Sequence, residues 1–292
     1  MANQILENGY EAQYLRILHD ISTTGKKKAD RTGVGTRSIW TSYMKIDLAQ
    51  GFPLLTTRFI AFRLAFEETM FFLRGLTDTK LLEEKKVNIW KGNTTREFLD
   101  KRNLAHLAEG DMGKGYGFQW RNFMGEEDSQ GVDQIEELIA GLRRDPDSRR
   151  HLVTAWNPKQ LPDMALPPCH CLWQCFVEGK TINMLFFMRS SDFYHGAPTN
   201  VASYALILHL LAHLLGYEAG ELVYMAGDVH LYETQMEVVT EQLGRTPDNP
   251  LPRIRFKKTF TTLEEMLSLN FEDVELVNYE HQGRLKKVEM AI

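Results

Sequence analysis

The order of apolar and polar positions predicts both helices and strands in this 292-residue chain. Apolar residues recur at helical spacing across 11–22 and 132–142, and 38–46 is predicted to be a strand. The stretch 172–177 is rich in apolar, β-branched and aromatic residues, and 181–187 repeats this pattern after a short polar turn. These last two strands are expected to pair as a hairpin.

One later segment, 201–215, is apolar nearly all round, which predicts a buried central helix. His209 and His213 lie four residues apart on it, a spacing that can bind a metal. Because no acidic partner motif lies nearby, we expect both to be core histidines with satisfied hydrogen bonds.

A second apolar segment, 61–73, carries two adjacent carboxylates, Glu67 and Glu68. Adjacent helical residues point about 100° apart, so at most one of the two can face squarely inward. Such a carboxylate would have a raised pKa and would be able to relay protons. The preceding turn is expected to enter the helix with Thr56 or Thr57 as its cap.

No composition break, linker or internal repeat divides the chain. We therefore predict one α/β domain of the α+β type over residues 1–292. Its sheet is expected to be mixed and largely antiparallel, and to be packed by helices that include the long buried one. Alternating βαβ units are not predicted.

Composition narrows the possible functions. The net charge of −5 gives no support for general nucleic-acid binding, so no DNA partner is expected. Residues 1–17 do not combine a basic start with an apolar run, and no window approaches 18 consecutive apolar residues. We therefore expect neither a signal peptide nor a membrane span. Three clustered cysteines do not form a disulfide framework, which favours a reducing cytoplasm.

All three cysteines, Cys169, Cys171 and Cys175, lie within seven positions of one another. A zinc site is possible, but Cys169 and Cys171 on a strand share a face that His170 does not. Burial as small apolar side chains suits Cys171 and Cys175. Cys169 follows two prolines that fix the chain, and the pattern favours it as a nucleophile.

Several polar clusters are candidates for binding. Glycines between Arg31 and Arg37 suit a phosphate or, equally, a turn into a strand. The glycine-rich loop 110–117 is expected to fit closely around another group. Trp90 is by default a core anchor. Four arginines surround the turn at 145–147 and are either a solvated surface or a phosphate site: Arg143, Arg144, Arg149 and Arg150.

A set of short motifs, in order along the chain, resembles the thymidylate synthase family. The motifs are Asp30-Arg31-Thr32-Gly33, Pro53-Leu54-Leu55-Thr56-Thr57, Tyr116-Gly117-Phe118-Gln119-Trp120-Arg121, Arg149-Arg150, Ala155-Trp156-Asn157-Pro158, Leu166-Pro167-Pro168-Cys169-His170, Arg189-Ser190-Ser191-Asp192, Asn200-Val201-Ala202-Ser203-Tyr204 and Gly227-Asp228-Val229-His230. The likeness runs from about Tyr14 to the C-terminus. No single motif is decisive, but the set is highly specific.

The resemblance implies a reaction. Cys169 would attack C6 of dUMP, and C5 would then take the one-carbon unit of 5,10-methylenetetrahydrofolate, with Glu68 relaying protons. Asn200 would read the uracil edge through its amide. The implied catalytic set is Cys169, Glu68, Asn200, Tyr116, Trp90 and His170.

The resemblance also implies binding sets. For the nucleotide they are Arg31, Arg149, Arg150, Arg189, Ser190, Gln174, Asp192, Asn200, His230 and Tyr232, of which His230 and Tyr232 share one strand face and would hold the ribose. For the folate they are Asp192, Trp90, Leu166, Gly196 and Ala291. Arg149 and Arg150 would reach the partner's phosphate, so an obligate homodimer is implied. No resident metal is implied.

The departures from the family pattern lie mostly around the folate. They are Met188, His195, Thr199, Lys91, Lys114-Gly115 and Glu233-Thr234-Gln235. Polar side chains on that wall would admit water, which would give a hydroxymethyl product from dUMP, dCMP or CMP instead of a methyl product. Methyl transfer is favoured because Trp90, Leu166, Tyr116 and Ile292 are retained.

Two other classes of protein remain as hypotheses. A nucleotide- or RNA-binding protein without turnover is disfavoured by the presence of Cys169 and Glu68. A hydrolase built on Cys169 and His170 is disfavoured because neighbouring strand residues point to opposite faces.

Overall fold

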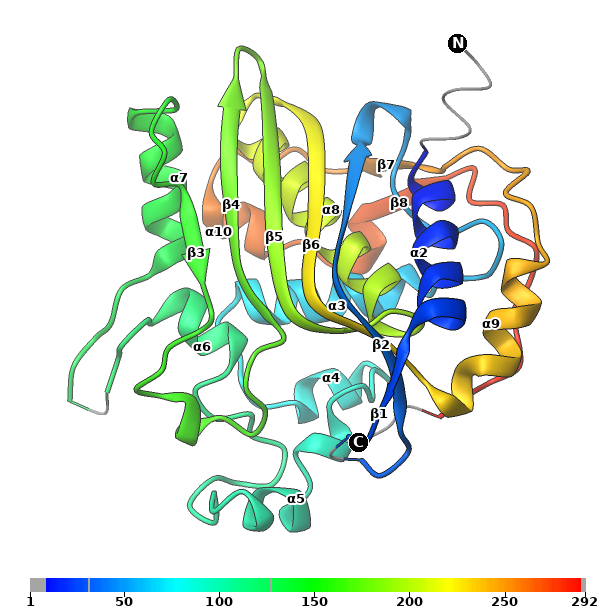
Figure 1. The fold of residues 1–292 in the computed structure, drawn as a ribbon. Coiled ribbons are helices and arrows are strands. Elements are labelled where there is room, and N and C mark those ends of the chain that lie inside the picture. Colours follow the sequence, from blue (N-terminus) through cyan, green and yellow to red (C-terminus); the bar gives the residue numbers. More distant parts are fainter. Residues whose placement is uncertain (1–8, 31, 127, 290–292) are drawn as a thin grey trace.

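The computed structural model describes residues 9–30, 32–126 and 128–289. A sheet of six strands runs through its centre in the order β1-β2-β6-β5-β4-β3 (Figure 1). Only β5 and β6 are parallel, and every other neighbouring pair is antiparallel. The predicted mixed, largely antiparallel sheet is confirmed. The six strands are β1 (Lys26–Lys28), β2 (Thr36–Asp47), β3 (Leu152–Thr154), β4 (His170–Glu178), β5 (Thr181–Asp192) and β6 (Glu218–Tyr232).

Helices cover one face of this sheet. Helix α8 lies on β5 and β6, and α3 lies on α8, whereas α2 rests on β2 near the sheet's edge. A separate two-stranded sheet pairs β7 (Arg253–Phe256) with β8 (Val274–Val277). The helices are α2 (Tyr10–Thr24), α3 (Phe62–Leu73), α4 (Lys80–Glu84), α5 (Arg96–Lys101), α6 (Tyr116–Arg121), α7 (Gln134–Arg144), α8 (Gly196–Leu215), α9 (Met236–Leu243) and α10 (Leu263–Leu267).

Helix α8 is the buried central helix that the sequence predicts. It connects β5 to the parallel strand β6, and Gly216 ends it in the left-handed conformation at φ 75°. Its length and apolar composition would suit a membrane span, but 67% of its most apolar window is buried inside the fold. Helix α8 is therefore apolar nearly all round because it packs between the sheet on one side and α3 on the other.

The histidines of α8 differ from the prediction. His213 is exposed, and its ring lies 4.3 Å from that of Phe260. His209 Nε2 is buried and has no hydrogen-bond partner among the described residues, and burial lowers its pKa to about 4. The expectation of two satisfied core histidines was wrong, because helical spacing does not show which side of α8 meets the last strands of the chain.

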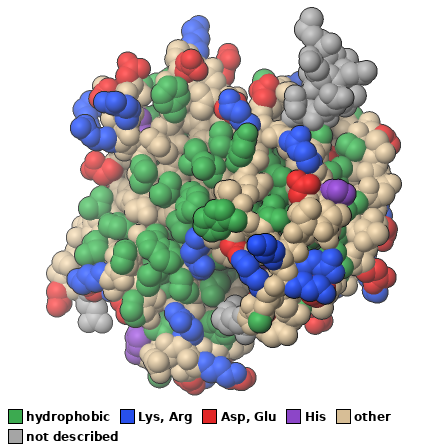
Figure 2. Space-filling model, in the orientation of Figure 1, with side chains coloured by type: hydrophobic (Ala, Val, Ile, Leu, Met, Phe, Trp, Pro, Cys, Tyr) green, Lys and Arg blue, Asp and Glu red, His purple; other side chains and the backbone are tan. Residues whose placement is uncertain are grey.

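The other face of the sheet carries no helix of the described residues in front of β4, β5 and β6 (Figure 1). A row of apolar side chains crosses it, because Tyr43 pairs with Met225, Met225 with Phe187, and Phe187 with Leu172. Tyr43 is 68% exposed. Figure 2 shows hydrophobic side chains gathered on this side of the molecule. Patches of this kind usually mark an interaction surface.

The entry to α3 also differs from the prediction. The helix begins at Phe62 with Ala61 as its cap, so neither Thr56 nor Thr57 caps it. Both threonines instead serve the carboxylate of Glu11 on α2. Their backbone N–H groups and their hydroxyls all donate to it, at 2.6–2.9 Å, in a buried cluster.

This carboxylate cluster predicts a large stability effect. Glu11→Ala would leave two amides and two hydroxyls buried without their acceptor, and is expected to lower the free energy of unfolding by roughly 3 kcal/mol or more. Urea denaturation measures this loss. Glu97→Ala is the matched control, because Glu97 is exposed and forms a surface ion pair with Lys101. Equal midpoints for the two variants would contradict the assignment.

Candidate active site

The predicted nucleophile, Cys169, directly precedes β4, and its backbone is held from two sides. Its N–H donates to the Tyr116 hydroxyl at 2.7 Å, and its carbonyl accepts from the Arg189 N–H at 2.8 Å. The β4–β5 pairing shifts register between His170 and Leu172, just after this point. The hairpin and α6 together therefore fix the backbone position from which the Cys169 side chain projects.

The guanidinium of Arg189 on β5 is rigidly placed beside the sulfur. Its Nε and Nη2 donate to the carbonyls of Pro168 and Pro167 at 2.8 and 2.9 Å. Nη2 also lies 3.8 Å from Cys169 Sγ. A fixed positive charge next to a cysteine sulfur is the arrangement that activates cysteine nucleophiles.

The carboxyl group of Glu68 comes from the middle of α3. The residue is only 9% exposed, and Trp90 Nε1 donates to Oε1 at 2.8 Å. Burial raises the pKa of Glu68 from 4.5 to about 7, against the lowering effect of that hydrogen bond. Glu67 is also buried but points to Lys85 at 2.6 Å. Of the adjacent pair, only Glu68 therefore borders the cavity beside His170 and Asn200.

His170 lies between two tyrosines. Its ring stacks on Tyr116 at 4.1 Å, and Nδ1 is 2.9 Å from the Tyr204 hydroxyl. Burial lowers the pKa of His170 to about 3, so the ring is neutral at physiological pH. It therefore orients its neighbours and does not act as the base of a cysteine–histidine pair, which agrees with the sequence argument against a hydrolase.

A small cavity joins these groups. The hydroxyls of Thr69 and Ser203 border it and have no partner among the described residues. The cavity has a volume of about 10 Å³, roughly the space that one water molecule needs, and the two hydroxyls would bind such a water. Its lining is Glu68, Thr69, Phe72, Trp120, His170, Asn200, Ser203, Tyr204 and Ile207. Three predicted site residues from α3, β4 and α8 therefore meet at one buried space.

The ends of β5 and β6 bring together more of the predicted set. Asp192 pairs with His230 in the parallel ladder. His230 Nδ1 lies 2.9 Å from Asp228 Oδ1, and its ring is 5.4 Å from that of Tyr232. Among the remaining predicted residues, Ser190 follows Arg189, Gly196 begins α8, and Leu166 packs partly buried against the core.

Three predicted nucleotide-binding residues lie elsewhere. Arg149 and Arg150 are exposed on the turn between α7 and β3. Gln174 Nε2 donates to the Arg149 carbonyl at 3.2 Å, and Gln174 shares the uncovered sheet face with Phe176. The fold therefore places Gln174 on the uncovered face and the two arginines on the exposed turn beside β3 and β4. Arg31 and Ala291 lie outside the described residues.

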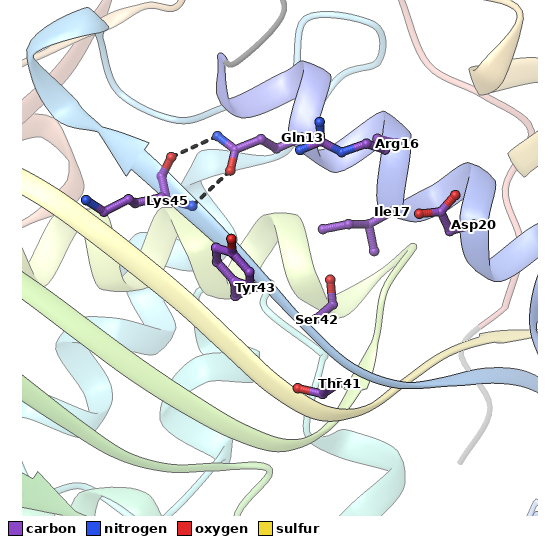
Figure 3. A pocket seen from close by; sticks show the side chains of 8 residues that line it. All are labelled: Gln13, Arg16, Ile17, Asp20, Thr41, Ser42, Tyr43 and Lys45. Carbon is purple, nitrogen blue, oxygen red and sulfur yellow. Dashed lines mark hydrogen bonds between the residues drawn. The ribbon is translucent and has the colours of Figure 1, made fainter.

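A pocket of about 630 Å³ lies between α2 and β2 (Figure 3). Gln13 spans its rim, where its amide exchanges two hydrogen bonds with the Lys45 backbone at 2.8 and 2.9 Å. The lining is Gln13, Arg16, Ile17, Asp20, Thr41, Ser42, Tyr43 and Lys45. None of these was predicted as a site residue, and none of them lines the cavity beside Glu68 and His170.

Sequence reasoning missed Gln235 as a candidate. It noted this position only as a departure after His230 and Tyr232. In the structure the side chain is 1% exposed and donates to both oxygens of Asp192 at 3.1 Å. A buried amide directly after a strand that carries site residues is the signal that would have found it.

A cysteine sulfur beside a fixed guanidinium, and a buried carboxyl group with a pKa of about 7, are the kinds of group that enzymes using covalent intermediates employ. A family model described as thymidylate synthase matches residues 12–292. The chain belongs to the thymidylate synthase family, which comprises methyltransferases.

Curated relatives cover nearly the whole chain. It is 41% identical to a thymidylate synthase of equine herpesvirus 2 (strain 86/87), over 97% of this chain and 98% of that protein. It is 39% identical to a thymidylate synthase of human herpesvirus 8 type P (isolate GK18), over 97% and 84%. A bifunctional dihydrofolate reductase-thymidylate synthase of Paramecium tetraurelia is 43% identical over 98% of this chain, which spans only 62% of that relative.

The raised pKa of Glu68 predicts a pH-dependent stability. The proton that the folded state retains stabilises it fully below the ordinary pKa of 4.5, and this contribution is lost as pH rises through about 7. Glu68→Gln removes this titration. The free energy of unfolding of the variant, minus that of the parent, should therefore rise by up to about 3 kcal/mol from acidic to mildly alkaline pH. Chemical denaturation at about pH 5 and pH 8 measures the difference. A gap that is the same at both pH values would contradict the assignment.

Proposed function

We propose that the protein transfers a one-carbon unit from 5,10-methylenetetrahydrofolate to C5 of dUMP, giving dTMP and dihydrofolate. The observation that carries this proposal is Cys169 Sγ beside the fixed guanidinium of Arg189, with the buried carboxyl group of Glu68 nearby. Attack of the thiolate on C6 makes C5 nucleophilic, and C5 then takes up the methylene carbon. Loss of the C5 proton expels tetrahydrofolate from the methylene carbon. Hydride transfer from that tetrahydrofolate to the methylene carbon then releases Cys169 and leaves dTMP and dihydrofolate.

Glu68 supplies and receives the protons of this sequence. A group with a pKa of about 7 is half protonated near neutrality, so it can act in both directions. The cavity shared with His170 and Asn200 has room for the water that would link the carboxyl group to the base. Trp90 sets the carboxyl orientation through its indole N–H.

Asn200 reads the base through its amide, on the first turns of α8. Its Nδ2 lies 3.5 Å from Met188 Sδ. A thioether sulfur only accepts hydrogen bonds, so this neighbour favours the orientation in which Nδ2 donates and Oδ1 is left to accept. Uracil offers O4 as an acceptor and N3–H as a donor, and both match. Cytosine presents the opposite pair, an amino donor and a bare N3 acceptor, and would require the amide to turn over against Met188. The proposed substrate is therefore dUMP in preference to dCMP.

The remaining contacts follow the family resemblance. Arg31, Arg189 and Ser190 hold the phosphate, and His230 and Tyr232 hold the ribose hydroxyl. The pterin binds Asp192. Trp90, Leu166, Gly196 and Ala291 surround the folate.

We further propose an obligate homodimer in the cytoplasm, in which Arg149 and Arg150 complete the partner's phosphate site. The apolar row on the uncovered sheet face supplies a surface that two copies would bury (Figure 2). Gln174 and Arg149 border this surface. Arg149 and Arg150 are exposed on the adjoining turn, where their side chains would be available to a partner subunit.

The alternative product, a hydroxymethylated nucleotide, requires water beside the methylene group. His195, one of the residues that depart from the family pattern, has a buried Nε2 and is therefore largely enclosed. The relatives above that match this chain over nearly its whole length are named thymidylate synthases. Both points favour methyl transfer.

The first prediction concerns the nucleophile. Cys169→Ser should reduce turnover of dUMP with methylenetetrahydrofolate by more than about a thousandfold, because a hydroxyl is a far weaker nucleophile, while dUMP binding stays largely intact. Mass spectrometry of the nucleotide product distinguishes a methyl from a hydroxymethyl group. Cys175→Ala is the matched control, because this thiol is buried in the core and should leave turnover in place. Turnover of Cys169→Ser within about tenfold of the parent would sink the assignment.

The second prediction concerns assembly. Arg150→Ala and Cys169→Ser should each be inactive, but refolding them together should form heterodimers with one intact site. Random pairing would restore roughly a quarter of the parent activity. Sedimentation checks the dimer. An active monomer, or a mixture that stays inactive although heterodimers form, would contradict action in trans.

A further inference from the structure

We propose that Gln235 is a positioning residue for the reduced folate: it fixes the Asp192 carboxylate so that Oδ2 faces the pterin. This inference rests on the proposed function, because it takes Asp192 as the pterin's partner. Gln235 closes the short turn Glu233–Gln235 that follows β6, and its side chain is 1% exposed. It stands among the positions where the chain departs from the family pattern.

Both ends of the Gln235 amide are engaged. Nε2 donates to Asp192 Oδ1 and to Oδ2, each at 3.1 Å. Oε1 accepts from the Tyr232 backbone N–H at 3.0 Å. An amide turned over would set its oxygen against the carboxylate and its N–H₂ against a backbone donor, so only one orientation is favourable. The side chain therefore clamps the end of β5 to the end of β6.

As a result, the two oxygens of the Asp192 carboxylate accept different numbers of hydrogen bonds. Oδ1 accepts from the N–H groups of Tyr194 and His195 at 3.2 and 3.1 Å, in addition to Gln235. Oδ2 accepts only from Gln235 in the hydrogen bonds of the described residues. Since each carboxylate oxygen has about two acceptor sites, Oδ1 is saturated and Oδ2 keeps one. Asp192 is partly exposed, so that site is open to an N–H donor of a ligand.

The choice of an amide matters electrostatically. Gln235 is neutral at every pH, so it orients Asp192 without cancelling its charge, and the carboxylate stays a strong acceptor. The charged and titratable groups around Asp192 are His195, Arg58, Tyr14, Tyr194 and Tyr224, together with His230, its partner in the parallel ladder. Burial lowers the pKa of His195 and raises that of each of the three tyrosines. His195 and the three tyrosines therefore keep their charge between about pH 7 and pH 8, and the parent enzyme, measured at the same pH values, controls for every other group.

The experiment measures the dissociation constant of tetrahydrofolate by calorimetry, with dUMP present. Gln235→Leu keeps the bulk but removes the donor, and should weaken folate binding by at least about tenfold. The KM of dUMP should change far less than that of the folate. Gln160→Leu is the matched control, because Gln160 is also 1% exposed and fully hydrogen-bonded, to Gln119, Asn157 and Gly125. It should lower Tm and leave folate affinity unchanged.

A second variant separates positioning from simple packing. Gln235→Glu sets a second carboxyl group 3.1 Å from Asp192, where two negative charges repel but one shared proton restores a donor. Relative to the parent, its folate affinity should recover by at least about threefold as pH falls from about 8 to about 7. A purely structural role would give the same ratio at both pH values.

The outcomes distinguish the two proposals. Equal folate affinity in the parent and Gln235→Leu overturns the positioning role and leaves the proposed reaction standing. A parent that binds tetrahydrofolate without forming dTMP overturns the reaction, whereas a weakened Gln235→Leu would still support the positioning role. A parent that binds no folate overturns both.

Discussion

The hydrogen bonds that hold the backbone of Cys169 are the constraint on which the site depends. The Tyr116 hydroxyl accepts from its N–H, and the Arg189 N–H donates to its carbonyl. One partner belongs to α6 and the other to β5, so the thiol sits where a helix and a hairpin meet. The Arg189 side chain also donates hydrogen bonds to the carbonyls of the two prolines before Cys169. These bonds hold its positive charge against the segment that carries the sulfur. The Cys169 sulfur and the Arg189 guanidinium therefore cannot separate without breaking these hydrogen bonds.

Close to this site the fold buries an ionisable side chain, Glu68, at a position where an apolar side chain would make the protein more stable. The carboxyl group of Glu68 is desolvated between α3, α8 and Trp90, and the raised pKa is the direct result. Stability is thereby given up in return for a group that gains and loses a proton near neutrality. Glu11 shows the contrasting solution, since its buried carboxylate receives four strong donors and serves only the structure.

The sequence predicted what local periodicity and motif order can encode. The strand hairpin around Cys169, the buried helix 201–215 and the inward carboxylate of α3 were predicted, because apolar spacing specifies a face. It could not assign Thr56 and Thr57 to Glu11, since that contact joins segments about 45 residues apart. The same holds for Gln235, whose partner lies 43 residues away. For Gln174, placement on the uncovered face depends on which side of the sheet the helices cover, and strand alternation alone does not settle that.

The burial of the cysteine cluster has a practical consequence for handling the protein. Cys171 and Cys175 are enclosed, and burial raises the pKa of both thiols, whereas Cys169 is partly exposed beside a cation. The chain therefore has three sulfhydryl groups of very different chemical reactivity. A mild alkylating reagent should consume one equivalent per chain, so a simple thiol count before and after treatment would report the fraction of intact sites in a preparation. The same asymmetry makes peroxide damage selective, because oxidation would remove activity long before it disturbed the core.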